Sequence, residues 1–193
     1  MVNRLFPESI IVQVMRDPRA NVSSQRSRWP QFSVWTCAMW WREAAIAGQK
    51  WGRENPSRYV AVQYEDLVLA PEETMRTLCR QLDIPFSPQL ITFDQQETMW
   101  EPGSGPQQKR FSRPDPSRIN LWQQYLSAQD VRLIEYGCRA QMALGHYQPL
   151  YDSPLTTQLR LRQLKEASQH RLLFLGKGVK SYWRRLKARR ALW

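Results

Sequence analysis

Short apolar runs alternate with longer amphipathic segments along the first half of the chain. Residues 9–15 form an almost uninterrupted apolar, β-branched run, which predicts a strand buried on both faces. A short helical pattern over 20–28 and a long one over 33–54 follow it, and residues 59–64 predict a second strand. Pro71 then opens a helix with acidic residues in its first turn. This alternation predicts an α/β fold with parallel strands.

The second half of the chain is less regular. Residues 87–93 predict a helical turn, and residues 94–117 predict a long loop rich in Pro, Gly, Ser and Gln. Ser127 and Asp130 have capping-box spacing and open a helix that reaches Leu144. Parallel sheets usually have several strands and are covered on both faces, so we expect part of this sheet to be missing.

Composition excludes several classes of site. The 193 residues include three widely spaced cysteines (Cys37, Cys79 and Cys138) without a C-x-x-C pair, so neither a disulfide framework nor a zinc site is indicated. Only two histidines occur, and no metal-binding spacing is present, so we expect no metal. There is no signal-peptide core and no apolar run long enough to span a bilayer, and we therefore expect a cytoplasmic protein.

The formal net charge of +11 is concentrated at the C-terminus. From residue 158 onward there are eleven Lys and Arg against one acid, whereas residues 1–157 are nearly neutral. The pattern predicts a domain over 1–150 and a basic amphipathic helical tail over 151–193. Residues 158–193 have two interpretations: a helix on an anionic membrane surface or other polyanion, or a solvated extension that packs partly on the domain. The second is favoured, and specific nucleic-acid recognition is not indicated.

The end of the first predicted strand carries the strongest candidate chemistry. Arg16 and Arg19 flank an Asp-Pro turn, and Ser23 and Ser24 follow near the start of a helix. Guanidinium groups, hydroxyls and a helix N-terminus together suit a phosphate. The alternative interpretation is a structural turn in which Asp17 and Arg19 pair with their neighbours.

These residues also resemble a known family. Residues 6–11, residues 16–19 (Arg-Asp-Pro-Arg) and Ser24 look like the 3′-phosphate-binding segment of the sulfotransferases that use 3′-phosphoadenosine 5′-phosphosulfate (PAPS). In that family an arginine at the strand end and a serine eight positions later hold the 3′-phosphate of the cofactor. The resemblance therefore implies that Arg16 and Ser24 bind this phosphate.

Two later segments extend the resemblance. Residues 62–68 (Val-Gln-Tyr-Glu-Asp-Leu-Val) and the helix from Pro71 are similar to the family's second strand and helix, which implies that Tyr64 lies near the adenine. The stretch from Arg118 through Trp122 to residue 147 resembles the family's C-terminal loop and closing helix. Asn-Leu replaces the usual Gly-Arg before the tryptophan, so Arg118 is the candidate for the missing phosphate contact.

The resemblance implies a fold and an activity. The fold would be a partial P-loop-NTPase-like three-layer α/β fold, and the reaction would be sulfuryl transfer from PAPS, without a metal, to a hydroxyl or amine of a carbohydrate, lipid or small molecule. Acceptor specificity is expected in residues 29–33 and 94–117. His146 and His170 lie outside the family's positions for a base, so no catalytic residue is assigned. Glu65 and Asp66 are expected to hold the strand end or an arginine.

One family element is not found in the sequence. The Gly-rich loop that binds the 5′-phosphosulfate should precede the first strand, and nothing of this kind stands before Phe6. We therefore expect a truncated domain that is inactive alone, unless another chain or an upstream in-frame segment supplies this half. The alternative is a non-catalytic binding module that uses a vestigial 3′-phosphoadenosine site, or its basic tail on a membrane or polyanion.

Overall fold

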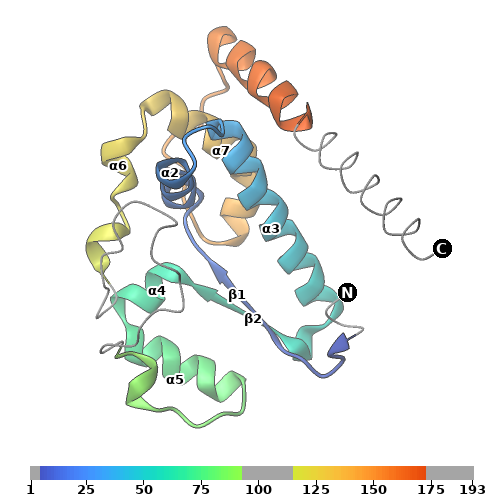
Figure 1. Ribbon diagram of the computed structural model, residues 1–193, viewed down its shortest axis with the longest axis vertical. Coiled ribbons are helices and arrows are strands. Elements are labelled where there is room, and N and C mark those ends of the chain that lie inside the picture. Colours follow the sequence, from blue (N-terminus) through green and yellow to red (C-terminus); the bar gives the residue numbers. More distant parts are fainter. Residues whose placement is uncertain (1–4, 93–114, 173–193) are drawn as a thin grey trace, which may run out of the picture.

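The computed structural model describes residues 5–92 and 115–172, and it contains a small parallel sheet packed against helices (Figure 1). The helices and strands are β1 (Ile11–Met15), α2 (Pro18–Arg28), α3 (Val34–Glu54), η1 (Pro56–Arg58), β2 (Tyr59–Gln63), α4 (Tyr64–Leu69), α5 (Pro71–Gln81), η2 (Pro88–Leu90), η3 (Pro116–Arg118), α6 (Trp122–Tyr125) and α7 (Ala128–Leu144). A further helix covers residues 157–172.

The two strands pair in parallel, in register from Ile11 opposite Tyr59 to Met15 opposite Gln63. Helices α2 and α3 form the crossover between them, as the alternation of elements predicts. The mixed helical fold with its small parallel sheet is consistent with the α/β class. β2 ends at Gln63, one residue earlier than expected, because Tyr64 begins the short helix α4.

Local sequence explains where the site's helices begin. The side chain of Asp17 accepts a hydrogen bond from the backbone N–H of Arg19, and Pro18 occupies the first turn, so α2 starts two residues earlier than expected. Further along the chain, Ser127 and Asp130 form the predicted capping box of α7.

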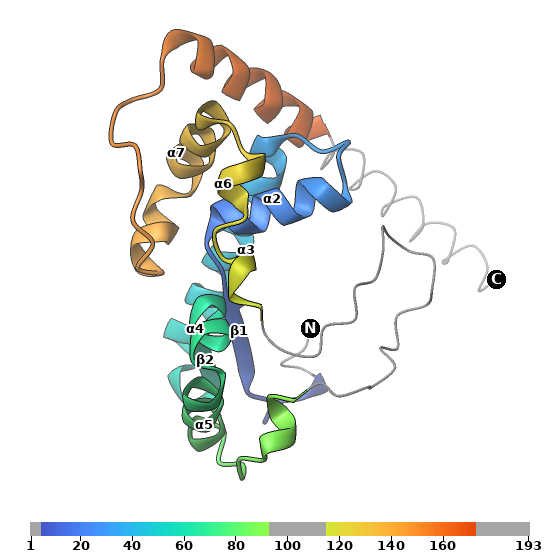
Figure 2. The same ribbon diagram turned by 90° about the vertical axis from the view of Figure 1, so that its left-hand side faces the viewer.

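Helix α3 covers one face of the sheet (Figure 2). The Gln13 amide donates to the carbonyl of Ala44 at 3.2 Å, and Gly48 lies directly against the same side chain. A Cβ at position 48 would collide with the Gln13 amide, so glycine permits this close approach of helix and strand.

The prediction that the first strand is buried on both faces is wrong for the face of β1 that points away from α3. Val12 and Val14 are 37% and 53% exposed, so the first strand is not buried on both faces. The neighbouring Val62 on that face is buried because α4 and α5 contact β2. Among the described residues, no helix extends this cover to β1. An apolar run predicts a strand, but whether each face of that strand is buried depends on which helices pack against it in the folded protein.

The main core lies between α2, α3 and α7 and contains Val22, Val34, Leu133 and Ile134, all fully buried. Leu155 and Leu159 join this core, so the described part of the basic tail packs on the domain.

Polar contacts reinforce this docking of the tail. Glu166 accepts the backbone N–H of Trp35 at 2.8 Å, at the N-terminus of α3. Arg162 bridges Glu166 at 2.7 Å and Asp130 at 2.6 Å. The division of the chain at residue 150 stays a prediction. Within residues 5–92 and 115–172, no helix is long and apolar enough to cross a membrane.

Candidate anion site at the end of the first strand

Three of the four predicted cofactor residues meet at the end of β1. Arg16 follows the strand directly and is half-buried. Its guanidinium carbon lies 4.4 Å from the centre of the Tyr64 ring, and its NH2 group donates to the backbone carbonyl of Arg118 at 3.1 Å. The carboxyl ends of parallel strands share one edge of a sheet, which explains why Arg16 and Tyr64 come together across 48 residues of sequence.

The Arg16 guanidinium is incompletely satisfied. Its Nε atom is buried and has no hydrogen-bond partner within the described residues. Buried donors are nearly always paired, and a guanidinium offers several donors in a fixed plane that matches a carboxylate or phosphate. This makes Arg16 the candidate donor to an anionic ligand at the end of β1.

The other predicted contacts are looser. Ser24 is exposed on α2, about 9 Å along the helix axis from Pro18, and in the part of the chain that is described no hydrogen bond joins it to Arg16. Arg118 reaches Arg16 through its backbone, whereas its own guanidinium lies 3.6 Å from Asp115 and is 42% exposed. The phosphate roles of both residues stay predictions.

Arg19, in contrast, is committed to the fold. It is only 6% exposed, and its guanidinium pairs with Asp17 at 2.6 Å and Glu135 at 2.8 Å. Its guanidinium carbon also lies 4.7 Å from the centre of the Trp122 ring. Burial acts to lower the pKa of Arg19, but the bonds and charges of both carboxylates outweigh this and raise it. The structural alternative for Asp17 and Arg19 is therefore confirmed.

Glu65 holds the strand end, as expected. Its Oε1 accepts the backbone N–H of Asp17 at 3.0 Å, and its Oε2 accepts the hydroxyl proton of Tyr147 at 2.8 Å. Burial, and then the charge of Glu65, raise the pKa of the Tyr147 phenol well above its ordinary value. The phenol therefore remains a neutral donor across the physiological pH range.

Two aromatic residues beside the site escape sequence reasoning. Tyr147 binds Glu65, and the Trp41 indole N–H donates to the backbone carbonyl of Arg16 at 2.9 Å. Trp41 lies 25 residues from Arg16 and reads as an ordinary apolar position of α3. The chain has nine tryptophans, and nothing in the sequence pattern distinguishes Trp41 among them as a partner of Arg16.

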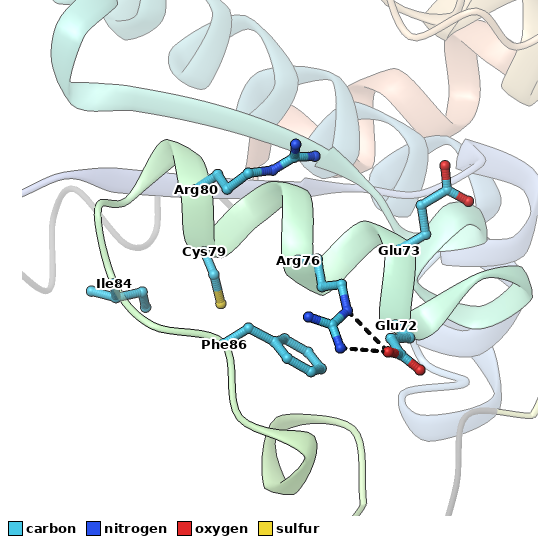
Figure 3. Close-up of a pocket in the computed structure, with 7 residues that line it drawn as sticks. All are labelled: Glu72, Glu73, Arg76, Cys79, Arg80, Ile84 and Phe86. Carbon is cyan, nitrogen blue, oxygen red and sulfur yellow. Dashed lines mark hydrogen bonds and ion pairs between the residues drawn. The ribbon is translucent and has the colours of Figure 1, made fainter.

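A well-defined hollow lies elsewhere, on α5 and the segment after it (Figure 3). It has a volume of about 580 Å³. Two of its charged lining residues pair with each other, since Arg76 lies 2.7 Å from Glu72, and the Arg76 guanidinium also stacks on Phe86 at 4.0 Å. It contains none of the predicted site residues. We therefore place the candidate site by the contacts of Arg16.

A second hollow bears on the acceptor. It has a volume of about 370 Å³ and is lined partly by residues 30–33, within the candidate acceptor segment 29–33. Helix 157–172 supplies another part of its wall. Most of the other candidate segment, 94–117, lies outside the described residues. Within the described ranges, no group of three or more His, Cys, Asp or Glu is placed to hold a metal ion.

Comparisons with known proteins agree with the geometry. Residues 1–88 match the family model described as "Sulfotransferase family". The chain is 33% identical over 94 residues to protein-tyrosine sulfotransferase 1 of Danio rerio, across 46% of this chain and 26% of that protein.

Two solved structures have the same fold. One is the sulfotransferase domain from the curacin biosynthetic pathway, with a TM-score of 0.59 and 16% identity over 76% of this chain and 56% of that one. The other is the sulfotransferase domain from the Synechococcus PCC 7002 olefin synthase, with a TM-score of 0.55 and 21% identity over 75% of this chain and 50% of that one.

This chain spans about a quarter of the curated relative's length and about half of each solved structure. The matched residues 1–88 include Arg16, Ser24 and Tyr64 but not Arg118. Taken with the geometry at the end of β1, these matches support the sulfotransferase family for this chain.

Proposed function

We propose that this chain takes part in sulfuryl transfer from PAPS to a hydroxyl or amine acceptor, and that it binds the 3′-phosphoadenosine part of the donor. The observation that carries the proposal is the half-buried Arg16 guanidinium. It lies on the Tyr64 ring with its Nε unpaired among the described residues. The 3′-phosphate would accept from Arg16, with Ser24 and Arg118 as further contacts, and Tyr64 would lie beside the adenine.

The reaction needs positioning more than covalent chemistry from the protein. The acceptor oxygen or nitrogen attacks sulfur in line, and the bond from sulfur to the bridging oxygen breaks. 3′-Phosphoadenosine 5′-phosphate (PAP) leaves with the bonding electrons, and the proton of the acceptor passes to water. Arg16 would hold the far end of the donor and so orient the reacting end. We assign no base.

Calorimetry with PAP tests the proposal on the 193-residue chain. We expect saturable binding, and we expect Arg16→Ala to weaken it by roughly 10- to 100-fold, since a hydrogen bond to a charged group contributes about 1.5–3 kcal/mol. Adenosine 5′-phosphate, which has no 3′-phosphate, should bind more weakly and should be insensitive to this substitution.

Arg76→Ala is the matched control. Arg76 also stacks on an aromatic ring and forms an ion pair, but it lies on α5, in the hollow that contains none of the predicted site residues. This variant should bind PAP normally. No binding of PAP at millimolar concentration, or equal losses in the two variants, would contradict the proposed function.

The described part of the tail supports a peripheral membrane location as a second element of the proposal. Leu161, Leu164 and Leu172 are 61–66% exposed on the helix over residues 157–172, next to the exposed cations Lys165 and Arg171. Apolar and cationic side chains on one exposed surface suit the interface of an anionic bilayer.

Vesicle binding tests this location. Vesicles that contain phosphatidylserine should bind the chain, and neutral vesicles should not. The double substitution Leu161→Glu with Leu164→Glu should abolish the binding to anionic vesicles. Equal binding to both vesicles would contradict the idea.

A further inference from the structure

One peptide group beside the candidate site is held at both of its polar atoms by side chains. In the peptide bond that joins Arg16 to Asp17, the carbonyl oxygen accepts from the Trp41 indole at 2.9 Å, and the N–H donates to Glu65 at 3.0 Å. Trp41 belongs to α3 and Glu65 to α4. A loop peptide between a strand and a helix is thus fixed by two separate elements of the fold.

This arrangement constrains the direction of the Arg16 side chain. A peptide unit is planar, so its orientation is set once its carbonyl and its N–H are both bound. That plane begins at the Cα of Arg16 and ends at the Cα of Asp17. Fixing it limits the backbone rotation that would otherwise swing the Arg16 guanidinium away from the Tyr64 ring.

We call the two hydrogen bonds from Trp41 and Glu65 to the Arg16–Asp17 peptide the clamp, and a third residue, Tyr147, orients one of its members. Tyr147 is only 8% exposed, and its hydroxyl donates to the second oxygen of Glu65 at 2.8 Å. Glu65 directly follows Tyr64 in the chain. The same carboxylate therefore ties the backbone next to Arg16 to the start of the helix that carries the ring on which Arg16 lies.

We propose that Trp41, Glu65 and Tyr147 are positioning residues that aim the Arg16 guanidinium at the 3′-phosphate of the ligand. The inference rests on the proposed function, because it assumes that Arg16 binds this phosphate. These three side chains act through the backbone of residues 16 and 17, and the clamp requires no contact between them and the ligand.

Substitutions that each remove one hydrogen-bond donor test this role in the full chain. Trp41→Phe removes the indole donor, and Tyr147→Phe removes the hydroxyl that orients Glu65. Each should weaken PAP binding by roughly tenfold, within the range of coupling between neighbouring residues. Neither should change the binding of adenosine 5′-phosphate, because that ligand lacks the group that Arg16 holds. A general loosening of the fold would weaken both ligands alike.

The Arg16→Ala background supplies a second readout. If Trp41 and Tyr147 act through Arg16, their substitution should cost no further PAP affinity once Arg16 is gone. Glu65→Gln keeps an acceptor for the Asp17 N–H, and it should retain more PAP affinity than Glu65→Ala. The comparison of Glu65→Gln with Glu65→Ala still tests the positioning role if Trp41→Phe or Tyr147→Phe folds poorly.

Control variants come from α3, which carries Trp41, and from α7, which precedes Tyr147. Trp35→Phe removes another buried indole of α3, 8% exposed, and Tyr136→Phe removes a hydroxyl from α7. Neither residue contacts the Arg16–Asp17 peptide through a hydrogen bond within the described ranges, and both variants should bind PAP like the unsubstituted chain.

The outcomes separate the two proposals. If the unsubstituted chain does not bind PAP, or if Arg16→Ala binds as well as it does, the proposed function fails. If Arg16 is required but Trp41→Phe and Tyr147→Phe bind like the controls, only the positioning role fails. It also fails if their losses persist in the Arg16→Ala background.

Discussion

Arg16 and Arg19 lie three positions apart at one turn, but their guanidinium groups differ in how fully the protein pairs them. Both lie over an aromatic ring, Arg16 over Tyr64 and Arg19 over Trp122. Arg19 is enclosed by two carboxylates, whereas Arg16 donates to one carbonyl and keeps a buried Nε unpaired among the described residues. A guanidinium already neutralised inside the protein supports the fold. A guanidinium that the fold leaves unsatisfied is available to a ligand.

The comparison is tested most strongly by Arg19→Met. This change leaves Asp17 and Glu135 buried without their cation, so the free energy of unfolding should fall by about 3–5 kcal/mol. Urea denaturation measures the loss, and Arg16→Met, which leaves no buried carboxylate unpaired, should change it by less than about 1 kcal/mol. Similar losses in both variants would remove the distinction between the two arginines.

A third arginine extends the comparison to the C-terminal helix. Arg162 also bridges two carboxylates, but its side chain is 31% exposed, so Arg162→Met should cost less than Arg19→Met, about 1.5 kcal/mol. A loss as large as that of Arg19→Met would show that burial does not rank these pairs.

The ion pair between Arg162 and Asp130 should make the free energy of unfolding depend on pH. Burial acts to raise the pKa of Asp130, but hydrogen bonds from Ser127 and Arg162 outweigh it and hold the pKa below its ordinary value of 3.8. The stability that Asp130 contributes is therefore complete above its unfolded pKa and is lost as the pH falls through the lowered, folded value. In urea titrations the difference between the unsubstituted chain and Arg162→Met should be full at about pH 6 and should narrow below about pH 4. A constant difference would contradict this assignment.

Lysine substitutions sharpen the distinction between charge and geometry. Arg16→Lys keeps the positive charge but loses the planar set of donors, so PAP should bind roughly tenfold more weakly than to the unsubstituted chain, yet more tightly than to Arg16→Ala. Arg19→Lys should lower stability instead and leave PAP affinity nearly unchanged. Calorimetry and urea denaturation on both variants provide the check, and an Arg16→Lys chain that binds PAP as well as arginine does would show that charge alone is sufficient.

The smallest expected signal is thiol reactivity. Cys37 and Cys138 are fully buried, and burial raises the pKa of Cys37 to about 11 and that of Cys138 to about 12. Neither thiol should react with a disulfide reagent at about pH 8 while the chain is folded, because labelling needs both an opening of the core and a thiolate. Arg19→Met should accelerate their labelling and Arg16→Met should not. Rapid labelling of the unsubstituted chain would contradict the burial of this core.

Much of the fold follows from local pattern. The two strands, the long helix α3 and the capping box of α7 were predicted within a few residues, because strand composition, helical periodicity and capping act over short distances. The exposure of Val12 and Val14 was not predicted, since it depends on the helices that lie against β1. Tyr147 and Trp41 were missed at the site because neither lies near Arg16 in sequence.

The sequence by itself determined the residue types at the end of β1 and their family resemblance: an arginine after an apolar strand, a serine in the next helix and a tyrosine after the second strand. The resemblance pointed to Arg16 for the phosphate, but the sequence did not show which carboxylate beyond Asp17 would neutralise Arg19. Only the tertiary structure decided this. It placed Glu135, 116 residues from Arg19, against that guanidinium and left Arg16 with a donor to spare. Carboxylates so distant in sequence meet a cation only through folding, and that meeting determines which charge is neutralised.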